Sequence, residues 1–165
     1  MFTIALEETL LEYPSNNGNA LAIIFTGCPH HCIGCHSKNL QLVQTYTESP
    51  SELIARIKEK AKRALTTKLV ITGGDCLYGN NLEYTIEIVN TLGNIFDICI
   101  YTGYDIEYVK TLNLKHVKYY KCGTYKKEIS RESMKTDTQF ILASSNQNFY
   151  DAEYNLLSKD GILNF

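Results

Sequence analysis

Three cysteines lie close together in the stretch FTGCPHHCIGCHS, which runs from Phe25 to Ser37. They are Cys28, Cys32 and Cys35, and we call them the loop thiols. Cysteine thiolates hold zinc ions and iron–sulfur clusters in proteins, and both kinds of site usually take four protein ligands. Either a fourth ligand comes from elsewhere in the chain, or one metal position stays open for chemistry.

Two interpretations of the loop thiols supply a fourth ligand. A zinc site could take it from a histidine of the same stretch, namely His30, His31 or His36. An electron-carrying cluster would take it from one of the other cysteines, which we call the core thiols: Cys76, Cys99 and Cys122. Cys99 and Cys122 fall in apolar runs, where cysteine usually packs as a small core residue. In the third interpretation, three thiolates hold a cubane cluster and one iron stays open, which is typical of a catalytic site.

The composition narrows the class of protein. The chain has 165 residues, 44% hydrophobic and 21% charged, which suits one globular domain over residues 1–165. A net charge of -2 argues against a large nucleic-acid surface. No apolar run approaches the ~20 residues of a membrane span, and the acidic start MFTIALEETLLEYP is not a secretory signal. We therefore expect a cytoplasmic protein without membrane or nucleic-acid contacts, whose reduced cysteines serve metal or redox chemistry.

Strands and helices must alternate to position the loop thiols. Short apolar runs predict strands at 20–27, 68–74, 97–104 and 116–123. Helical spacing and end signals predict helices at 50–65, 81–93 and 105–112. Ser49 and Glu52 form the expected capping box of the first helix, with Pro50 at its first position. Residues 124–137 are predicted as a polar loop, and a last strand is predicted near 139–142.

This alternation predicts an α/β fold with right-handed βαβ units and a mostly parallel sheet. Four units are too few for a closed barrel, so we expect a partial, open βα barrel. Ligands in such sheets bind at the carboxyl ends of the strands. The cysteine stretch, TGGDC at 72–76 and YTGY at 101–104 all fall at those ends.

The spacing C-x3-C-x2-C after a first strand, with TGGDC ending the next, resembles the signature of radical S-adenosylmethionine enzymes. The order FTGCPHHCIGCHS, TGGD, YTGY and SSNQ, over roughly residues 21–150, resembles the activating proteins of anaerobic ribonucleoside-triphosphate reductases. The segment KCGTYKKEI is similar to a K-x-G-x-Y-x-x-E segment of that family. The chain departs from many relatives at Ser37, where Asn is frequent, and at Cys76, where Pro is frequent.

The resemblance implies a partial barrel of the radical S-adenosylmethionine type and a [4Fe–4S] cluster. A one-electron donor such as flavodoxin or ferredoxin would reduce the cluster. Its open iron would be chelated by the amino and carboxylate groups of S-adenosylmethionine. Reductive cleavage would give methionine and a 5′-deoxyadenosyl radical, which takes a hydrogen atom from a glycine of the large reductase subunit. The partner implied is therefore a glycyl radical protein.

The resemblance also assigns residues. Cys28, Cys32 and Cys35 become the cluster ligands and the catalytic centre. The residues implied to contact the cofactor are Gly34, His36, Gly73, Gly74, Asp75, Ser145 and Asn146. Asp75 would accept a hydrogen bond from the cofactor ammonium group or would fix the glycine turn. Ser145 and Asn146 belong to the polar shelf SSNQ, which would serve the cofactor or the partner, or would only cap a loop.

Two other functions remain open from the residues. One is a small radical S-adenosylmethionine enzyme with a small-molecule substrate, such as 7-carboxy-7-deazaguanine synthase. The other is a zinc-stabilised binding module without catalysis.

Overall fold

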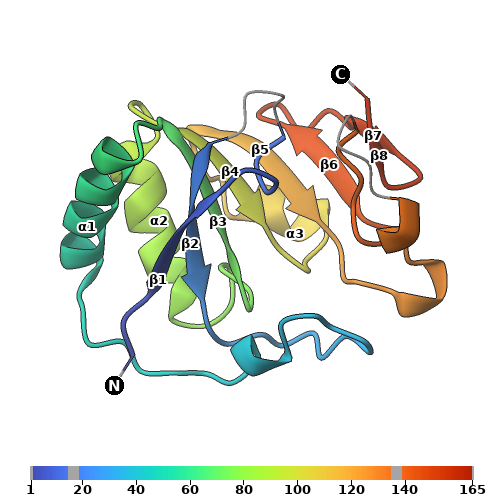
Figure 1. Cartoon of the computed structure of the whole chain (residues 1–165), viewed down its shortest axis with the longest axis horizontal. Helices are drawn as coiled ribbons and strands as arrows, with labels where there is room; N and C mark the ends of the chain where they lie inside the picture. The colour runs from blue at the N-terminus through green and yellow to red at the C-terminus, as the bar shows by residue number, and fades with distance from the viewer. Residues whose placement is uncertain (1, 15–18, 135–138, 165) are drawn as a thin grey trace.

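The structure is a computed structural model that describes residues 2–14, 19–134 and 139–164. Its main sheet has six strands in the order β1-β2-β3-β4-β5-β6, as Figure 1 shows. Their bounds are β1 Ala5–Thr9, β2 Ala20–Phe25, β3 Lys68–Gly73, β4 Asp97–Tyr101, β5 Val117–Cys122 and β6 Asn148–Asp151. Strands β2 to β5 are parallel, and the two edge strands are antiparallel to their neighbours. The sheet is therefore open and mostly parallel, as predicted.

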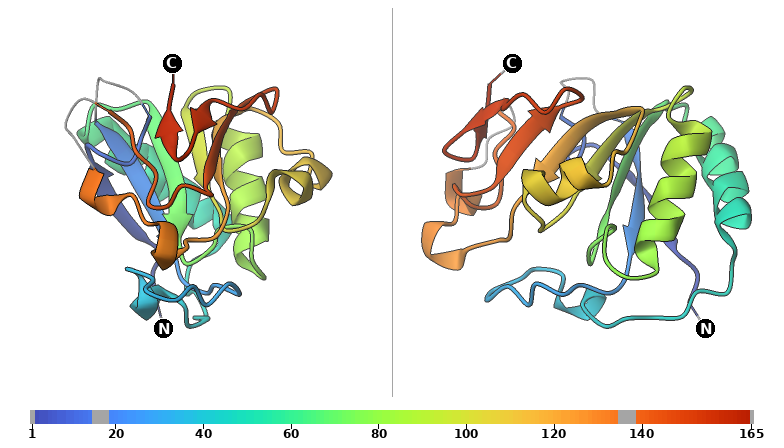
Figure 2. Two further views of the ribbon diagram at one scale, coloured as in Figure 1. Left: turned by 90° about the vertical axis from the view of Figure 1, so that its right-hand side faces the viewer. Right: turned by 180° about the vertical axis from the view of Figure 1, so that it is seen from behind.

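Three α-helices connect the parallel strands: α1 Pro50–Arg63, α2 Asn81–Leu92 and α3 Ile106–Thr111. All three cover the same face of the sheet, which is turned toward the viewer on the right of Figure 2. The predicted capping box of α1 is confirmed, because Ser49 and Glu52 exchange hydrogen bonds at its start. None of the helices in the described residues is long and apolar enough to cross a membrane.

Two apolar clusters flank the sheet. The larger lies between the sheet and the helices and includes Leu53, Ile71 and Ile100. The smaller lies on the helix-free face, where Val70, Cys99 and other residues pack against the carboxyl-terminal segment. Neighbouring residues of a strand point to opposite faces of the sheet and so reach opposite clusters. Cys99 and Cys122 are both buried, so the core packing predicted for them is confirmed.

Two sequence-based expectations differ from the structure. The strand predicted near 139–142 is wrong: this segment carries isolated bridges, among them the one from Ile141 to Ile162, and the last main-sheet strand is β6. The strand β1 was not predicted. Within the polar loop predicted at 124–137, residues 124–134 form only two short 3-10 turns, η2 Lys127–Ile129 and η3 Glu132–Met134, and residues 135–137 lie outside the described part. The two-stranded sheet of β7 Ser158–Lys159 and β8 Ile162–Leu163 ends the chain.

Candidate metal and cofactor site

The loop thiols lie on the segment that leaves β2 and runs below the carboxyl ends of the parallel strands, drawn in light blue in Figure 1. Its two ends meet. The N–H of Gly27 donates to the carbonyl of Leu40 at 2.7 Å, and the N–H of Cys28 donates to the carbonyl of Gln41 at 3.1 Å. We call residues 27–41 the cysteine loop. Closed ends of this kind define an Ω-type loop, which is fixed at its base and carries its functional groups between.

Two glycines seal the base of the cysteine loop against β3. A Cβ atom at Gly73 would lie 2.2 Å from the carbonyl oxygen of Phe25, and one at Gly74 would lie 2.4 Å from that of Gly27. The N–H groups of Gly74 and Asp75 donate to those same two oxygens, each at 2.8 Å. The backbone of this glycine pair therefore packs against the chain itself and positions the start of the cysteine loop, and the cofactor contacts implied for Gly73 and Gly74 remain predictions.

The loop thiols differ from the core thiols in exposure and acidity. All six cysteines are free, but the loop thiols are partly exposed and the core thiols are buried. Burial raises the pKa of Cys28, and the Asp75 carboxylate and the other loop thiols raise it further, whereas the backbone N–H of His30 lowers it. Burial also raises the pKa of Cys122 to about 12 and that of Cys76 and Cys99 well above the ordinary value. The loop thiols are therefore the accessible cysteines of the six.

Asp75 is a buried centre of hydrogen bonds. Its side chain is 0% exposed. Oδ1 accepts from the N–H of Leu77 at 2.9 Å, and Oδ2 accepts from the N–H of Gly103 at 2.8 Å. The hydroxyl of Thr102 lies 3.0 Å from both oxygens. A side-chain contact with a cofactor would have to displace one of these donors, so the geometry favours the other expected role, that of fixing the turn.

His30 joins the cysteine loop to this centre. Its Nε2 lies 2.8 Å from Oδ2 of Asp75, and because a carboxylate only accepts, Nε2 carries the proton. The edge of the imidazole meets the ring of Tyr104 at 4.7 Å between centroids. Thus the cysteine loop, the TGGDC turn and the YTGY turn, which the sequence placed at one edge of the sheet, are linked in the structure.

The outer side of the cysteine loop packs against the segment that follows β5. Nε2 of His36 pairs with Glu132, and its ring meets that of Tyr125 at 5.8 Å. Gly34 has a φ of +77°, and a Cβ atom there would lie 3.0 Å from Cδ of Lys127. Both residues therefore contact the 125–132 segment, and their predicted place beside a cofactor stays a prediction.

The polar shelf SSNQ fastens that same segment. The hydroxyl of Ser144 donates to Oδ1 of Asn146 at 2.8 Å, and Nδ2 of Asn146 donates to the carbonyl of Thr124 at 2.9 Å. The N–H of Ser145 donates to the carbonyl of Ile129 at 3.0 Å. The shelf thus acts as the capping loop that the sequence left open, and the cofactor contacts expected for Ser145 and Asn146 remain predictions.

A hollow of about 360 Å³ adjoins the cysteine loop on the helix-free face. Ser37 and Leu40 of the loop line one side, and Thr72 and Gly73 form part of the floor. The remaining lining residues are Glu7, Glu8, Thr9, Glu12, Ala22 and Ile24. The sequence pattern does not predict this acidic wall because it does not predict β1, although the glutamates of ALEET are the available signal.

Lys121 extends the polar lining of the helix-free face. It is the register partner of Tyr101, and its Nζ lies 5.6 Å from the centre of that ring. Burial lowers the pKa of Lys121, while the Asp75 carboxylate and the thiol of Cys32 act in the opposite direction. A cation thus stands near the cysteine loop on the same face as the hollow.

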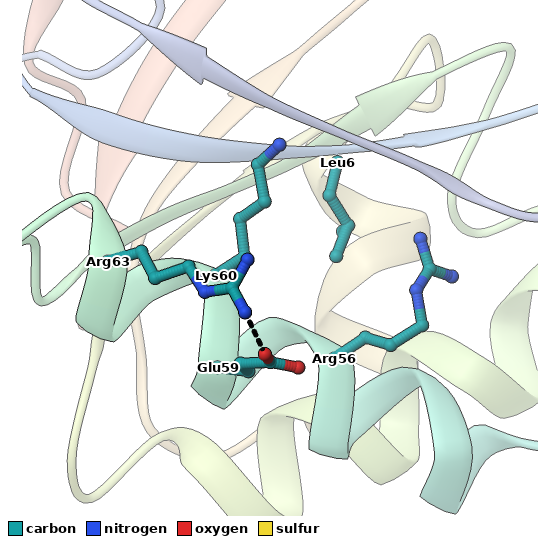
Figure 3. A pocket seen from close by; sticks show the side chains of 5 residues that line it. All are labelled: Leu6, Arg56, Glu59, Lys60 and Arg63. Atoms are coloured by element: carbon teal, nitrogen blue, oxygen red, sulfur yellow. Dashed lines mark hydrogen bonds and ion pairs between the residues drawn. The ribbon is translucent and has the colours of Figure 1, made fainter.

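A smaller hollow of about 160 Å³ lies between β1 and α1, as Figure 3 shows. Its lining residues are Leu6, Arg56, Glu59, Lys60 and Arg63. Two of the three cations are neutralised locally, since Arg63 pairs with Glu59 and Arg56 pairs with Glu48. None of its lining residues belongs to the cysteine loop, whereas Ser37 and Leu40 of that loop line the larger hollow.

The loop thiols fit an iron–sulfur cluster by donor type and exposure. In the part of the chain that the structure describes, no three His, Cys, Asp or Glu side chains converge on one metal position. Metal binding would therefore complete the arrangement, as is common when binding is coupled to local ordering. Two of the three histidines considered for zinc have other partners, because His30 pairs with Asp75 and His36 pairs with Glu132, whereas His31 is exposed.

Comparison with known proteins agrees with this chemistry. The model of the 4Fe-4S single cluster domain family matches residues 16–150, so the chain belongs to that family of iron–sulfur proteins. A curated relative is the anaerobic ribonucleoside-triphosphate reductase-activating protein of Enterobacteria phage T4. It is 30% identical over 131 residues, which cover 74% of this chain and 81% of the relative. No solved structure was found to match the chain.

Proposed function

We propose that this protein is a radical S-adenosylmethionine activase that generates a glycyl radical on an anaerobic ribonucleoside-triphosphate reductase. The relative from phage T4, named for activation of such a reductase, supports the reaction. The open α/β sheet, with its cysteine loop at the carboxyl ends of parallel strands, suits the partial barrel that this class requires. A bound, reduced [4Fe–4S] cluster would supply the electron for cleavage of S-adenosylmethionine.

The chain's own residues would hold and orient these groups. The loop thiols Cys28, Cys32 and Cys35 would bind the cluster and leave its fourth iron open, because the core thiols are buried elsewhere. Backbone groups of the Gly73–Gly74 turn would meet the methionine amino group beside the hollow. Lys121 would attract the methionine carboxylate from the helix-free face.

The partner would complete the enclosure of the site. The hollow opens on the face that the α-helices leave uncovered, and its acidic wall comes from Glu7 and Glu8 of the edge strand β1 and from Glu12, which follows it. A glycine on an exposed loop of the reductase could enter there, and exclusion of water would follow from docking. A one-electron donor such as flavodoxin or ferredoxin would then act before docking, while the cysteine loop is exposed.

The observation that carries the proposal is the division of the six cysteines into three accessible loop thiols and three core thiols. The test is anaerobic reconstitution, followed by iron and sulfide analysis and by measurement of 5′-deoxyadenosine after addition of dithionite and S-adenosylmethionine. We expect about four irons per chain and reductant-dependent cleavage. Addition of a purified anaerobic reductase should then give a glycyl radical signal in electron paramagnetic resonance.

Variants sharpen this test. Changing any one loop thiol to alanine should abolish both the cluster and the cleavage. The matched control is Cys122→Ala, which removes a buried thiol from β5 and should leave both intact. A wild-type protein that takes up one zinc ion and produces no 5′-deoxyadenosine would overturn the proposal.

A further inference from the structure

We propose that His30 is a positioning residue, whose hydrogen bond to Asp75 locks the cluster-binding half of the cysteine loop onto the sheet. The proposal concerns the site to which we assign the cluster and rests on the proposed function for its purpose. The geometry on which it stands does not depend on a bound group. It also gives Asp75 a role distinct from direct cofactor contact.

The position of His30 in the chain makes the lock effective. His30 stands between Cys28 and Cys32, so fixing it restrains two loop thiols. The backbone hydrogen bonds described above hold only the base of the loop, and a turn from Cys35 N–H to the carbonyl of Cys32 is internal to it. Of the hydrogen bonds among the described residues, the one from His30 ties this part of the loop to the sheet.

Asp75, which accepts the hydrogen bond from His30, is itself fixed by burial and by other hydrogen bonds. The side chain of Asp75 is fully buried, and that of His30 is 13% exposed. Leu77, Thr102 and Gly103 supply other donors to the carboxylate, so it is fixed from two neighbouring turns. Their number means that the carboxylate stays satisfied when His30 is removed, and the turn should persist without it.

The space for the imidazole is also built into the fold. A Cβ atom at Gly103 would lie 2.3 Å from Cδ2 of His30, so only glycine leaves room for the ring at this point. Tyr104, next in the chain, covers the ring from another side at 4.7 Å. The YTGY turn is thereby accounted for: it supplies a donor to Asp75 and a seat for His30.

The variants separate the hydrogen bond from the packing. His30→Phe keeps a flat ring but has no donor, and His30→Gln restores an N–H near the place of Nε2. The matched control is His31→Asn, because His31 is exposed and has a left-handed φ of 46°, which asparagine tolerates. All four proteins, including the wild type, are compared reduced and without metal.

The first measurement is the rate at which iodoacetamide modifies each cysteine, followed by mass spectrometry. Loss of the lock should expose half-buried Cys28 about tenfold more often in His30→Phe, a change equal to about 1.4 kcal/mol. His30→Gln and His31→Asn should modify Cys28 within about threefold of the wild-type rate. The core thiols provide an internal reference, because general loss of stability would raise their rates together with that of Cys28.

The second measurement is cluster reconstitution with iron and sulfide, followed by electron paramagnetic resonance of the reduced protein. His30→Phe should retain less iron and give a broadened signal, and His30→Gln should restore both. If Cys28 reacts at the wild-type rate in His30→Phe, or if all six cysteines accelerate together, the positioning role is wrong. A wild-type protein that builds no cluster would instead overturn the proposed function, while the metal-free rates would still decide the role of His30.

Discussion

Gly74 offers a quantitative test of how the cysteine loop is seated. In Gly74→Ala, the added Cβ would lie 2.4 Å from the carbonyl oxygen of Gly27 and 2.6 Å from that of Leu40. Each oxygen would have to retreat by roughly 1 Å to reach ordinary contact distance. The same two oxygens accept the hydrogen bonds from Asp75 and Gly27 that close the base of the loop. The φ of Gly74 is not positive, so the effect is steric alone.

The cost follows from these contacts. Forced overpacking costs about 1–3 kcal/mol, and weakening two hydrogen bonds adds roughly 1–2 kcal/mol. The gain from a stiffer unfolded chain, about 0.4–1 kcal/mol, offsets only part of this. We therefore expect Gly74→Ala to be destabilised by roughly 2–4 kcal/mol, which lowers the melting temperature by roughly 4–16 °C for a chain of this size.

The assay is urea and thermal unfolding of the reduced, metal-free protein, followed by circular dichroism. Gly79→Asn is the matched control, since Gly79 has open space around its Cα and a φ of +55° that asparagine accepts. It should unfold within about 1 kcal/mol of the wild type. A Gly74→Ala protein that melts with the control would show that the cysteine loop is not seated on this turn.

Three further outcomes are expected. Burial raises the pKa of Cys122 to about 12 in the folded protein, whereas in the unfolded chain the thiol has a pKa of about 8.5. The stability that the protonated thiol contributes is therefore fully present below about pH 8.5 and is lost as the pH rises toward 12. Urea unfolding at rising pH should show a slope that Cys122→Ala reduces by up to about 1.4 kcal/mol per pH unit; an unchanged slope would contradict the burial argument. Lys121→Met should weaken binding of S-adenosylmethionine to the reconstituted protein about tenfold, equal to about 1.4 kcal/mol, whereas equal affinity by titration would remove Lys121 from the site. Asn146→Ala loses the hydrogen bond to the Thr124 carbonyl, so limited proteolysis within residues 124–134 should become faster while the free energy of unfolding falls by only about 1 kcal/mol. An unaltered cleavage pattern would show that the shelf does not hold this segment.

The sequence predicted those elements whose signals are local. Strands β2 to β5 and helices α1 to α3 carry apolar periodicity, caps or glycine stops, and each lies where it was expected within a few residues. Strand β1 was not predicted because the segment ALEET buries only Leu6, which gives no apolar pattern. The position of β1 is set by its pairing with β2. The strand predicted near 139–142 failed because apolar character reports burial and not pairing: Leu142 is buried, yet β5 pairs with β6.

In the candidate site, too, features with a local signal were predicted and features set by distant contacts were not. Because ligand-binding segments follow the carboxyl ends of parallel strands, the sequence correctly predicted that the cysteine loop, the TGGDC turn and the YTGY turn lie at one edge of the sheet. It could not show which way Asp75 faces, because that depends on donors from Thr102 and Gly103, which come from another strand end. His30 was considered only as a metal ligand, and nothing in the local pattern pairs it with a carboxylate 45 positions later.

The distance along the chain between His30 and its anchor has a consequence for synthesis. The cysteine loop leaves the ribosome first, whereas Asp75, Thr102 and the SSNQ shelf follow much later. Contacts between distant segments form slowly, because loop closure must precede them. The nascent chain therefore passes through a stage in which its three loop thiols are made but not yet seated. We expect cluster insertion to be a late event, limited by completion of the sheet as far as β5, and premature oxidation of the loop to be a characteristic failure of its biogenesis.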